Sequence, residues 1–239
     1  MQQKDETRYS EAQIRWLLDA AEQGYLDEQY ELAMCYLEGN GLEKDYAKAV
    51  EWFRKAAEYE HPQAQLELAK CYENGYGVKK ASDEAAKWYF KAAEQDNAEA
   101  QFQIGMCYFT GKGVDRDVLK AMKWFMKSAE KGSLNGQFQL AYCYEAGQGV
   151  NQNDDKAFEL YLAAAEHGQD GAQARLGSIY ANGVCGVAID MEKAKKWYKL
   201  AAEQGNPDAT QWLADNNNYP AYSFHYSNCN CIVQTEQTN

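Results

Sequence analysis

One unit of about 36 residues recurs five times in this chain of 239 residues, and this periodicity limits the possible folds more than any other feature. Three residue types return at equivalent positions in successive units. They are the tyrosines Tyr36, Tyr72, Tyr108, Tyr144 and Tyr180, the glutamines Gln29, Gln65, Gln101, Gln137 and Gln173, and the tryptophans Trp16, Trp52, Trp88, Trp124 and Trp197. A period of this size indicates a solenoid, in which each unit buries its apolar face against its neighbours.

Each unit predicts two antiparallel helices joined by a short turn. In the third unit, apolar residues at helical spacing run from Ala100 to Tyr108, and Gly111 and Gly113 then interrupt the pattern. A second amphipathic stretch follows Asp117, whose side chain is suited to cap the start of a helix. Similar N-cap candidates recur at Asp45, Asn153 and Asp190, whereas Ala81 interrupts the series.

The repeated motifs resemble a known family. Segments such as Ala98-Glu99-Ala100-Gln101, Gly111-Lys112-Gly113-Val114 and Lys91-Ala92-Ala93-Glu94 are similar to those of Sel-one-like repeat proteins, relatives of the tetratricopeptide repeat with a longer turn between the helices. The resemblance extends over residues 10 to 215 and implies an all-α, right-handed superhelical α-solenoid of antiparallel helix pairs. The departures are local: Glu60 and Asp96 replace the terminal glycine of their units, Leu160 replaces tryptophan, and Cys185 lengthens the fifth unit to 37 residues.

The chain divides into full repeats and two half-repeat caps. We expect a flexible N-terminus over residues 1–9, an N-terminal capping helix over 10–25, a C-terminal capping helix over 206–216 and an irregular tail over 217–239. The five repeats between the caps span residues 26–60, 61–96, 97–132, 133–168 and 169–205. Ser10 and Gln13 can form a capping box at the start of the first helix, with Trp16 and Leu17 expected on its packing side.

The charge balance limits the partners. The chain has 24 basic and 36 acidic residues and a formal net charge of −12. This balance disfavours nucleic acid and anionic membranes, because both are bound largely through Lys and Arg. It is compatible with a basic protein partner, although solubility explains it equally well. Because the sequence has no apolar run of the ~18 residues that span a membrane, and no signal-peptide core at its start, we expect a cytoplasmic protein. We also expect a monomer.

Four of the seven cysteines share one register. Cys35, Cys71, Cys107 and Cys143 each precede the repeated tyrosine. Equivalent positions in packed repeats lie about 8–10 Å apart or more, whereas a disulfide requires Cα atoms within about 7 Å. We therefore expect buried, reduced thiols that behave as small apolar side chains. Some secreted members of the family that the motifs resemble pair two cysteines within each repeat, and this chain does not follow that pattern.

Little in the sequence indicates catalysis. His61, His167 and His225 lie in unrelated registers and form no i, i+4 pair for a metal or for a base and nucleophile, and we expect no cofactor. The resemblance leaves one enzymatic alternative, a β-lactam-binding or hydrolysing enzyme like the cysteine-rich secreted relatives, which would need paired cysteines, an export signal and an activated serine. The other alternative is metal binding by His225, Cys229 and Cys231 in the tail, although a closed zinc site prefers four ligands.

The candidate binding residues are those that vary between repeats, since the constant ones serve the fold. By analogy with the tetratricopeptide repeat, the first helix of each repeat lines the concave face. Its first variable position holds Tyr30, Leu66, Phe102, Phe138 and Ala174, its second holds Met34, Lys70, Met106, Tyr142 and Ser178, and Leu37 and Phe109 lie one turn further on. The first position is explained equally well by packing between repeats. The second accepts Lys70 and Ser178, which favours an exposed surface.

These positions predict a protein-binding groove on the concave face. Its residues are Tyr30, Met34, Leu66, Lys70, Phe102, Met106, Phe109, Phe138 and Tyr142. Aromatic and methionine side chains would anchor a peptide or protein segment. Nearby acidic residues would favour basic flanks in that partner, namely Glu31, Glu67, Glu73, Glu99 and Glu145. The chain is therefore predicted to be a non-enzymatic protein–protein interaction scaffold or adaptor.

Overall fold

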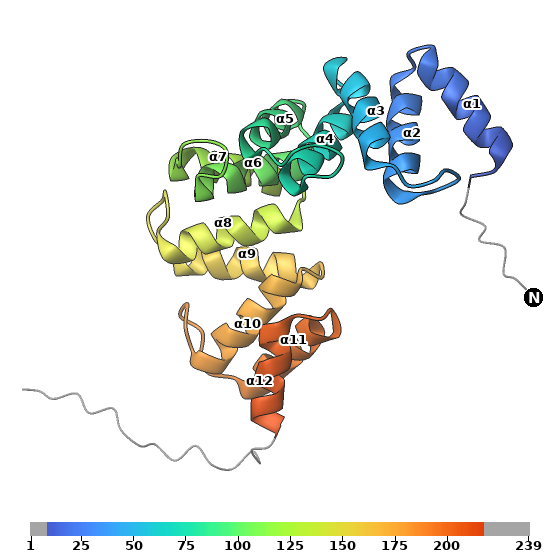
Figure 1. The fold of residues 1–239 in the computed structure, drawn as a ribbon. Coiled ribbons are helices and arrows are strands. Elements are labelled where there is room, and N and C mark those ends of the chain that lie inside the picture. The colour runs from blue at the N-terminus through green and yellow to red at the C-terminus, as the bar shows by residue number, and fades with distance from the viewer. Residues whose placement is uncertain (1–8, 218–239) are drawn as a thin grey trace, which may run out of the picture.

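The computed structural model describes residues 9–217, which form twelve α-helices and no strand. The helices are α1 (Glu11–Glu22), α2 (Leu26–Glu38), α3 (Tyr46–Glu58), α4 (Pro62–Asn74), α5 (Ser82–Glu94), α6 (Ala98–Thr110), α7 (Val118–Glu130), α8 (Leu134–Ala146), α9 (Asp154–Glu166), α10 (Asp170–Asn182), α11 (Met191–Glu203) and α12 (Pro207–Asn217). They follow one another along an open arc with α1 and α12 at its two ends (Figure 1). The predicted all-α solenoid is confirmed.

The helix ends explain why each repeat divides into two helices. The first helix of each repeat ends at a glycine with φ between 63° and 81°, a left-handed conformation that costs glycine little. The second helices start where Asp45, Asp117, Asn153 and Asp190 accept hydrogen bonds from amides of the first turn, as predicted, and Ala81 makes no such bond.

A second glycine in the turn is required by a close approach between repeats. A Cβ atom at Gly113 would lie 2.0 Å from the carbonyl oxygen of Ser82, and one at Gly77 would lie 2.1 Å from that of Tyr46. The turn of one repeat therefore lies directly on the start of the second helix in the preceding repeat. Any side chain at this position would force neighbouring repeats apart.

Two departures from the repeat keep the conformation of the glycine they replace. Glu60 and Asp96 have φ values of 66° and 62°. A residue with a side chain costs roughly 1–2 kcal/mol in this conformation. The packing of the flanking helices therefore imposes the turn even where the sequence lacks glycine.

A side-chain hydrogen bond joins a first helix to the helix before it at four of the repeated glutamines: Gln29, Gln65, Gln101 and Gln173. The side-chain amide of Gln65 donates to the carbonyl of Ala57 at 3.0 Å, and Gln101 donates to the carbonyl of Ala93 at 3.2 Å. These acceptors lie at the C-terminus of a helix, where carbonyl groups have no partner within the helix. Because the glutamines are buried, the bond satisfies groups that would otherwise be costly to remove from water, which explains why this polar residue recurs in the core.

The core lies between the two helices of each repeat. One position on the second helices holds a large buried side chain in every repeat: Phe53, Tyr89, Phe125, Tyr161 and Tyr198. It meets small residues of the first helix, and a Cβ atom at Gly105 would lie 2.6 Å from the ring of Phe125. The alternation of large and small side chains lets the two helices approach closely.

At two junctions the first helices lie closer to one another than the second helices do. α6 approaches α8, and α10 approaches α12, whereas no two second helices within residues 9–217 make comparable contact. The more closely spaced side of a curved array is its inner side. At these two junctions the first helices therefore lie on the inner side of the array.

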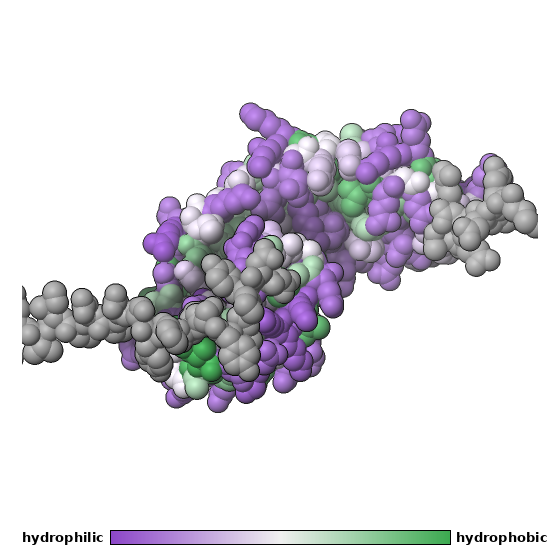
Figure 2. Space-filling view, turned by 90° about the horizontal axis from the view of Figure 1, so that it is seen from below, coloured by the Kyte–Doolittle hydropathy of each residue, from purple (hydrophilic) through white to green (hydrophobic). Residues whose placement is uncertain are grey.

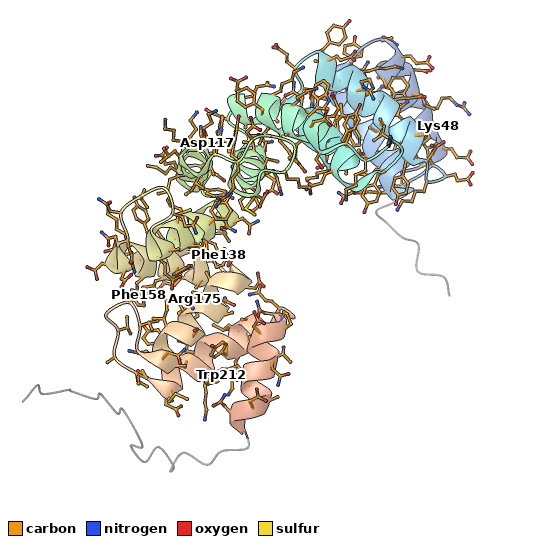
Figure 3. The ribbon with its side chains drawn as sticks, turned by 60° about the vertical axis from the view of Figure 1, so that its left-hand side comes forward. Lys48, Asp117, Phe138, Phe158, Arg175 and Trp212 are labelled. Carbon is orange, nitrogen blue, oxygen red and sulfur yellow. The ribbon has the colours of Figure 1, made fainter. Side chains whose placement is uncertain are left out.

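The two ends of the described array are covered differently. At the C-terminal end, the ring of Trp212 in α12 stacks on Tyr198 of α11 with 4.3 Å between centroids (Trp212 is labelled in Figure 3). At the N-terminal end, Ser10 and Gln13 form the predicted capping box. Trp16, however, is 61% exposed, so its expected position on the packing side is wrong. The described helices leave most of its surface accessible to solvent.

The four cysteines of the repeated register are buried, and none of the five described cysteines forms a disulfide. Burial raises the pKa of Cys71 to about 12 and that of Cys107 to about 11. These groups stay protonated near neutral pH and therefore behave as small apolar side chains.

Candidate functional site

The predicted groove residues all lie on first helices, but they differ in exposure. Leu66 is buried and belongs to the core, so it offers no surface to a partner. Tyr142 is 39% exposed. The others are half-buried: Tyr30, Met34, Lys70, Phe102, Met106, Phe109 and Phe138.

An apolar cluster lies in the middle of the array, where α6 meets α8. Phe102 and Phe109 flank the buried ring of Phe125, with centroids 6.2 Å and 6.1 Å away, and Met106 packs on the same core. The ring of Tyr142 meets Phe109 edge to face at 6.3 Å. We call Phe102, Met106, Phe109 and Tyr142 the central apolar group. Each of its side chains is in part accessible to solvent.

The first variable position also serves packing within its own repeat. The ring of Tyr30 lies 5.9 Å from Phe53, and that of Phe138 lies 5.7 Å from Tyr161. Phe102 makes the equivalent contact with Phe125. These aromatic residues therefore stabilise the two helices of a repeat whether or not a partner binds them.

A pocket of about 510 Å³ lies between α2 and α4, and its mixed lining includes the charged residues Glu38, Lys44, Glu67 and Lys70. Lys70 lines it and pairs with Glu67 at 2.7 Å. Tyr46 and Tyr76 stack at its edge with centroids 5.0 Å apart. The N-terminal half of the array thus differs in chemistry from the central apolar group.

A carboxylate connects the second repeat to the third. Glu73 on α4 accepts a hydrogen bond from the hydroxyl of Tyr89 at 2.6 Å and one from the ammonium of Lys112 at 2.5 Å. Burial alone would raise the pKa of Glu73, but the bonds from Lys112 and Tyr89 outweigh burial and lower it. Burial and the same carboxylate raise the pKa of Tyr89. The hydroxyl therefore stays a donor and the carboxylate an acceptor.

The same arrangement recurs two repeats later with a different cation. Glu145 on α8 accepts from the hydroxyl of Tyr161 at 2.8 Å and from both Nε and Nη2 of Arg175, the Nε contact being 3.1 Å (Arg175 is labelled in Figure 3). The bond to Glu145 raises the pKa of Arg175. We call Glu73 with Tyr89 and Lys112, and Glu145 with Tyr161 and Arg175, the two carboxylate bridges. Each joins one repeat to the next.

Sequence reasoning missed the carboxylate bridges, although a signal for them was present. Where the large core position is Tyr89 or Tyr161, the position 16 residues before it is Glu73 or Glu145. Where the core position is phenylalanine, the earlier position is apolar, as in Phe109 before Phe125. A buried hydroxyl requires an acceptor, so the two positions change together in the first four repeats; the fifth repeat departs from this pattern, with Ala181 and Tyr198.

The glutamates expected to favour basic flanks are mostly occupied by internal partners. Glu73 and Glu145 belong to the carboxylate bridges, and Glu67 pairs with Lys70. Glu99 accepts from the side-chain amide of Gln103 at 2.8 Å. Glu31 accepts from the hydroxyl of Tyr9 at 3.1 Å and is exposed. Of the five glutamates, Glu31 is therefore the one whose charge is least neutralised by contacts within the chain.

The histidines of the described residues have local structural contacts. His61 caps α4 and lies 3.1 Å from Asp27, and His167 contacts the carbonyl of Ala163 at 2.8 Å. Residues 9–217 contain no group of three metal-ligating side chains, and none of their helices is both long and apolar enough to cross a membrane. The proposed tail ligands His225, Cys229 and Cys231 lie outside the described residues.

Comparison with known proteins accounts for the repeated geometry. The Sel1 repeat profile matches residues 29–58, 62–97, 98–133, 134–169 and 171–206. No curated protein sequence matches the chain to a significant degree.

Three solved structures share the architecture. A protective antigen of uropathogenic Escherichia coli with an SLR fold is 39% identical with a TM-score of 0.75, and the match covers 86% of this chain and 44% of that one. This chain therefore corresponds to less than half of the antigen's length. A Sel1 repeat protein from Oxalobacter formigenes is 36% identical with a TM-score of 0.75, over 81% and 79% of the two chains. An immunity protein from Pseudomonas aeruginosa, 24% identical with a TM-score of 0.54 over 79% and 69%, shares the fold. With five matched repeats along this solenoid, the chain belongs to the Sel1 repeat family.

Proposed function

We propose that the chain is a non-enzymatic scaffold that binds a peptide or protein segment on the concave face of repeats two to four. Proteins with Sel1 repeats generally act as protein-interaction scaffolds. The observation that carries the proposal is the central apolar group, in which four adjacent apolar side chains keep accessible surface at the middle of the first helices. Adjacent exposed apolar side chains on a soluble protein commonly mark an interaction site.

The composition of the group suits a binding surface. Methionine adapts its shape to a ligand, and aromatic rings supply large contact areas with few rotatable bonds. The face seen in Figure 2 is mainly hydrophilic with small hydrophobic groups between, so apolar contacts on this face would be confined to small areas. A short segment with two or three apolar side chains is therefore the ligand that the central apolar group fits best.

The carboxylate bridges flank the central apolar group and support the proposal indirectly. The Glu73 bridge links repeats two and three, and the Glu145 bridge links repeats four and five. Rigid neighbours lower the conformational cost of binding. Basic flanks in the partner would be attracted by the net charge of −12 and by Glu31, since most inner glutamates are already paired.

The proposal includes a monomer in the cytoplasm. The unpaired thiols of the five described cysteines fit a reducing compartment.

The test combines binding with stability. A partner captured from source cells is first identified, and its affinity for the purified chain is then measured. Met106→Ala with Tyr142→Ala should weaken binding by about 2 kcal/mol or more, the scale of interface anchors. The matched control, Leu119→Ala with Met126→Ala, removes two exposed apolar side chains from α7 and should leave the affinity unchanged.

Thermal melting of the same variants separates a binding role from packing. Tyr142→Ala alone should change the free energy of unfolding by under ~0.5 kcal/mol, since Tyr142 is exposed. Unfolding of that variant would mean that the group is part of the core. Binding that survives the double change would move the site to the outer face, the pocket between α2 and α4, or the tail.

A further inference from the structure

The second helices contain a repeated contact between lysine and tryptophan. Lys55 lies over the ring of Trp52 at 3.5 Å, Lys91 over that of Trp88 at 4.1 Å, and Lys127 over that of Trp124 at 4.4 Å. In each pair the lysine follows the tryptophan by three residues on the same helix. An ammonium group over an indole face is attracted by the π-electrons of the ring. Three consecutive repeats thus cover this ring with a cation of their own.

Helix α1 has the tryptophan without the lysine. Trp16 occupies the same register, but the residue three positions later is Asp19. Within residues 9–217, no lysine or arginine lies over the Trp16 ring. The exposed fraction is 61% for Trp16 and 8% for Trp88. The ring that internal repeats cover with a cation is therefore open at this end, with a carboxylate where the lysine would be.

The open ring belongs to a pocket between α1 and α2. The pocket has a volume of about 460 Å³ and is lined by Trp16, Asp19, Ala20, Gln23, Tyr25 and Glu28. Tyr25 is 58% exposed and supplies a second aromatic ring. The lining has two carboxylates and no basic side chain, and neither Asp19 nor Glu28 forms an ion pair within the described residues. Aromatic rings beside unpaired carboxylates form a binding environment for a cation.

We propose that this pocket binds a lysine or arginine side chain of a protein partner. The cation lies over the ring of Trp16, as Lys91 lies over Trp88, and its N–H groups donate to Asp19 and Glu28. The lysine–tryptophan pairs of the repeats show the geometry of such a contact. Because Asp19 stands where those pairs have lysine, the cation has to come from another molecule. The net charge of −12 attracts a basic segment toward the chain.

The site is separate from the surface in the proposed function. It lies at the end of the array, between α1 and α2, whereas the central apolar group lies on α6 and α8. A second copy of the chain is the competing occupant. In that case the cation would be Lys199, which is exposed on α11 of the second copy. Lys199 occupies the register of Phe90 on α5, and the ring of Phe90 contacts Trp124, the tryptophan of the next repeat.

The experiment uses the full chain with its tryptophan indoles labelled with ¹⁵N for NMR. The Trp16→Phe variant identifies the Trp16 signal by its loss. Titration with Nα-acetyl-lysine methylamide should shift that signal in a saturable manner, and the uncharged norleucine analogue should not shift it. The Met106→Ala, Tyr142→Ala variant should respond like the parent, so this site and the proposed function succeed or fail independently.

Asp19→Lys is the decisive variant, because it rebuilds the internal pair and fills the pocket with an intramolecular cation. It should reduce the response to the lysine probe about fivefold or more. Glu159→Lys makes the same change of charge at an exposed position where α5 and α7 already have Lys87 and Lys123, and it should keep the response. An unchanged response in Asp19→Lys, or no response in the parent, would overturn the proposal. A Trp16 signal that moves with protein concentration alone would assign the pocket to a second copy instead.

Discussion

Neighbouring repeats are joined in two different ways along the concave face. Between repeats two and three, and again between four and five, a half-buried carboxylate meets a tyrosine of its own repeat and a cation of the next. Between repeats three and four the equivalent position is Phe109, which contacts the ring of Tyr142. One register position thus supports an ionic junction or an aromatic one without changing the helices around it.

The difference shows that a constant period does not make the repeats equivalent. Glu73, Phe109 and Glu145 lie at intervals of 36 residues, yet two of them are acceptors and one is an apolar side chain. Each choice is stable because its core partner matches it, with Tyr89 for Glu73 and Phe125 for Phe109. The aromatic junction leaves apolar surface where the ionic junctions leave charge, and we therefore place the proposed binding surface at the aromatic junction.

The largest expected effect is at the core of the aromatic junction. Phe125→Ala removes a fully buried ring that supports Phe102 and Phe109, and it should lower the free energy of unfolding by about 3–5 kcal/mol in urea titration. Phe109→Ala, at the half-buried rim, should cost less. Equal costs for the two changes would mean that Phe109 is as much a core residue as Phe125.

A double-mutant cycle at the Glu73 bridge should give a smaller effect. Glu73→Leu leaves the buried hydroxyl of Tyr89 without its acceptor and should cost about 1–3 kcal/mol. Combining it with Tyr89→Phe recreates the apolar pair Leu37 and Phe53 of the first repeat. The double variant should therefore lose less free energy of unfolding than the sum of the losses in the two single variants. Additive costs would contradict the bridge.

Acid should weaken the ionic junction at Glu73. The pKa of Glu73 in the folded chain is below its usual value of 4.5, so its contribution to stability is present above that value and is lost as the pH falls through the folded pKa. Glu73→Gln removes this contribution. The difference in melting temperature between parent and variant should therefore be constant near neutral pH and shrink as the pH falls below 4.5. A constant difference down to the lowest pH would contradict this assignment.

The cysteines should show the smallest difference between the two kinds of junction. Cys71 and Cys107 are both buried and have raised pKa values, so neither should react with a thiol reagent in the native chain at neutral pH. Mass spectrometry of the unreduced protein should find no bridge among Cys35, Cys71, Cys107 and Cys143. A disulfide between Cys71 and Cys107 would contradict the register on which the repeat alignment depends.

Much of the fold was predictable because it follows from local spacing. The capping aspartates, the interruption at Ala81 and the capping box of Ser10 and Gln13 lie where the pattern predicts them, since caps act within one turn of a helix. Leu66 and Trp16 were less predictable. Their burial depends on which element lies across from them, and Leu66 is covered whereas Trp16 is not.

By itself the sequence determined the repeat, the two helices of each unit, the caps and the register of the buried cysteines, because each depends on residues a few positions apart or on a period that repeats them. Only the tertiary structure decided how the charges are used. Lys112 reaches Glu73 across 39 residues and Arg175 reaches Glu145 across 30, so the two cations come from different positions in their repeats. Contacts of that kind depend on how neighbouring repeats are oriented in space, and the same orientation leaves the ring of Trp16 open.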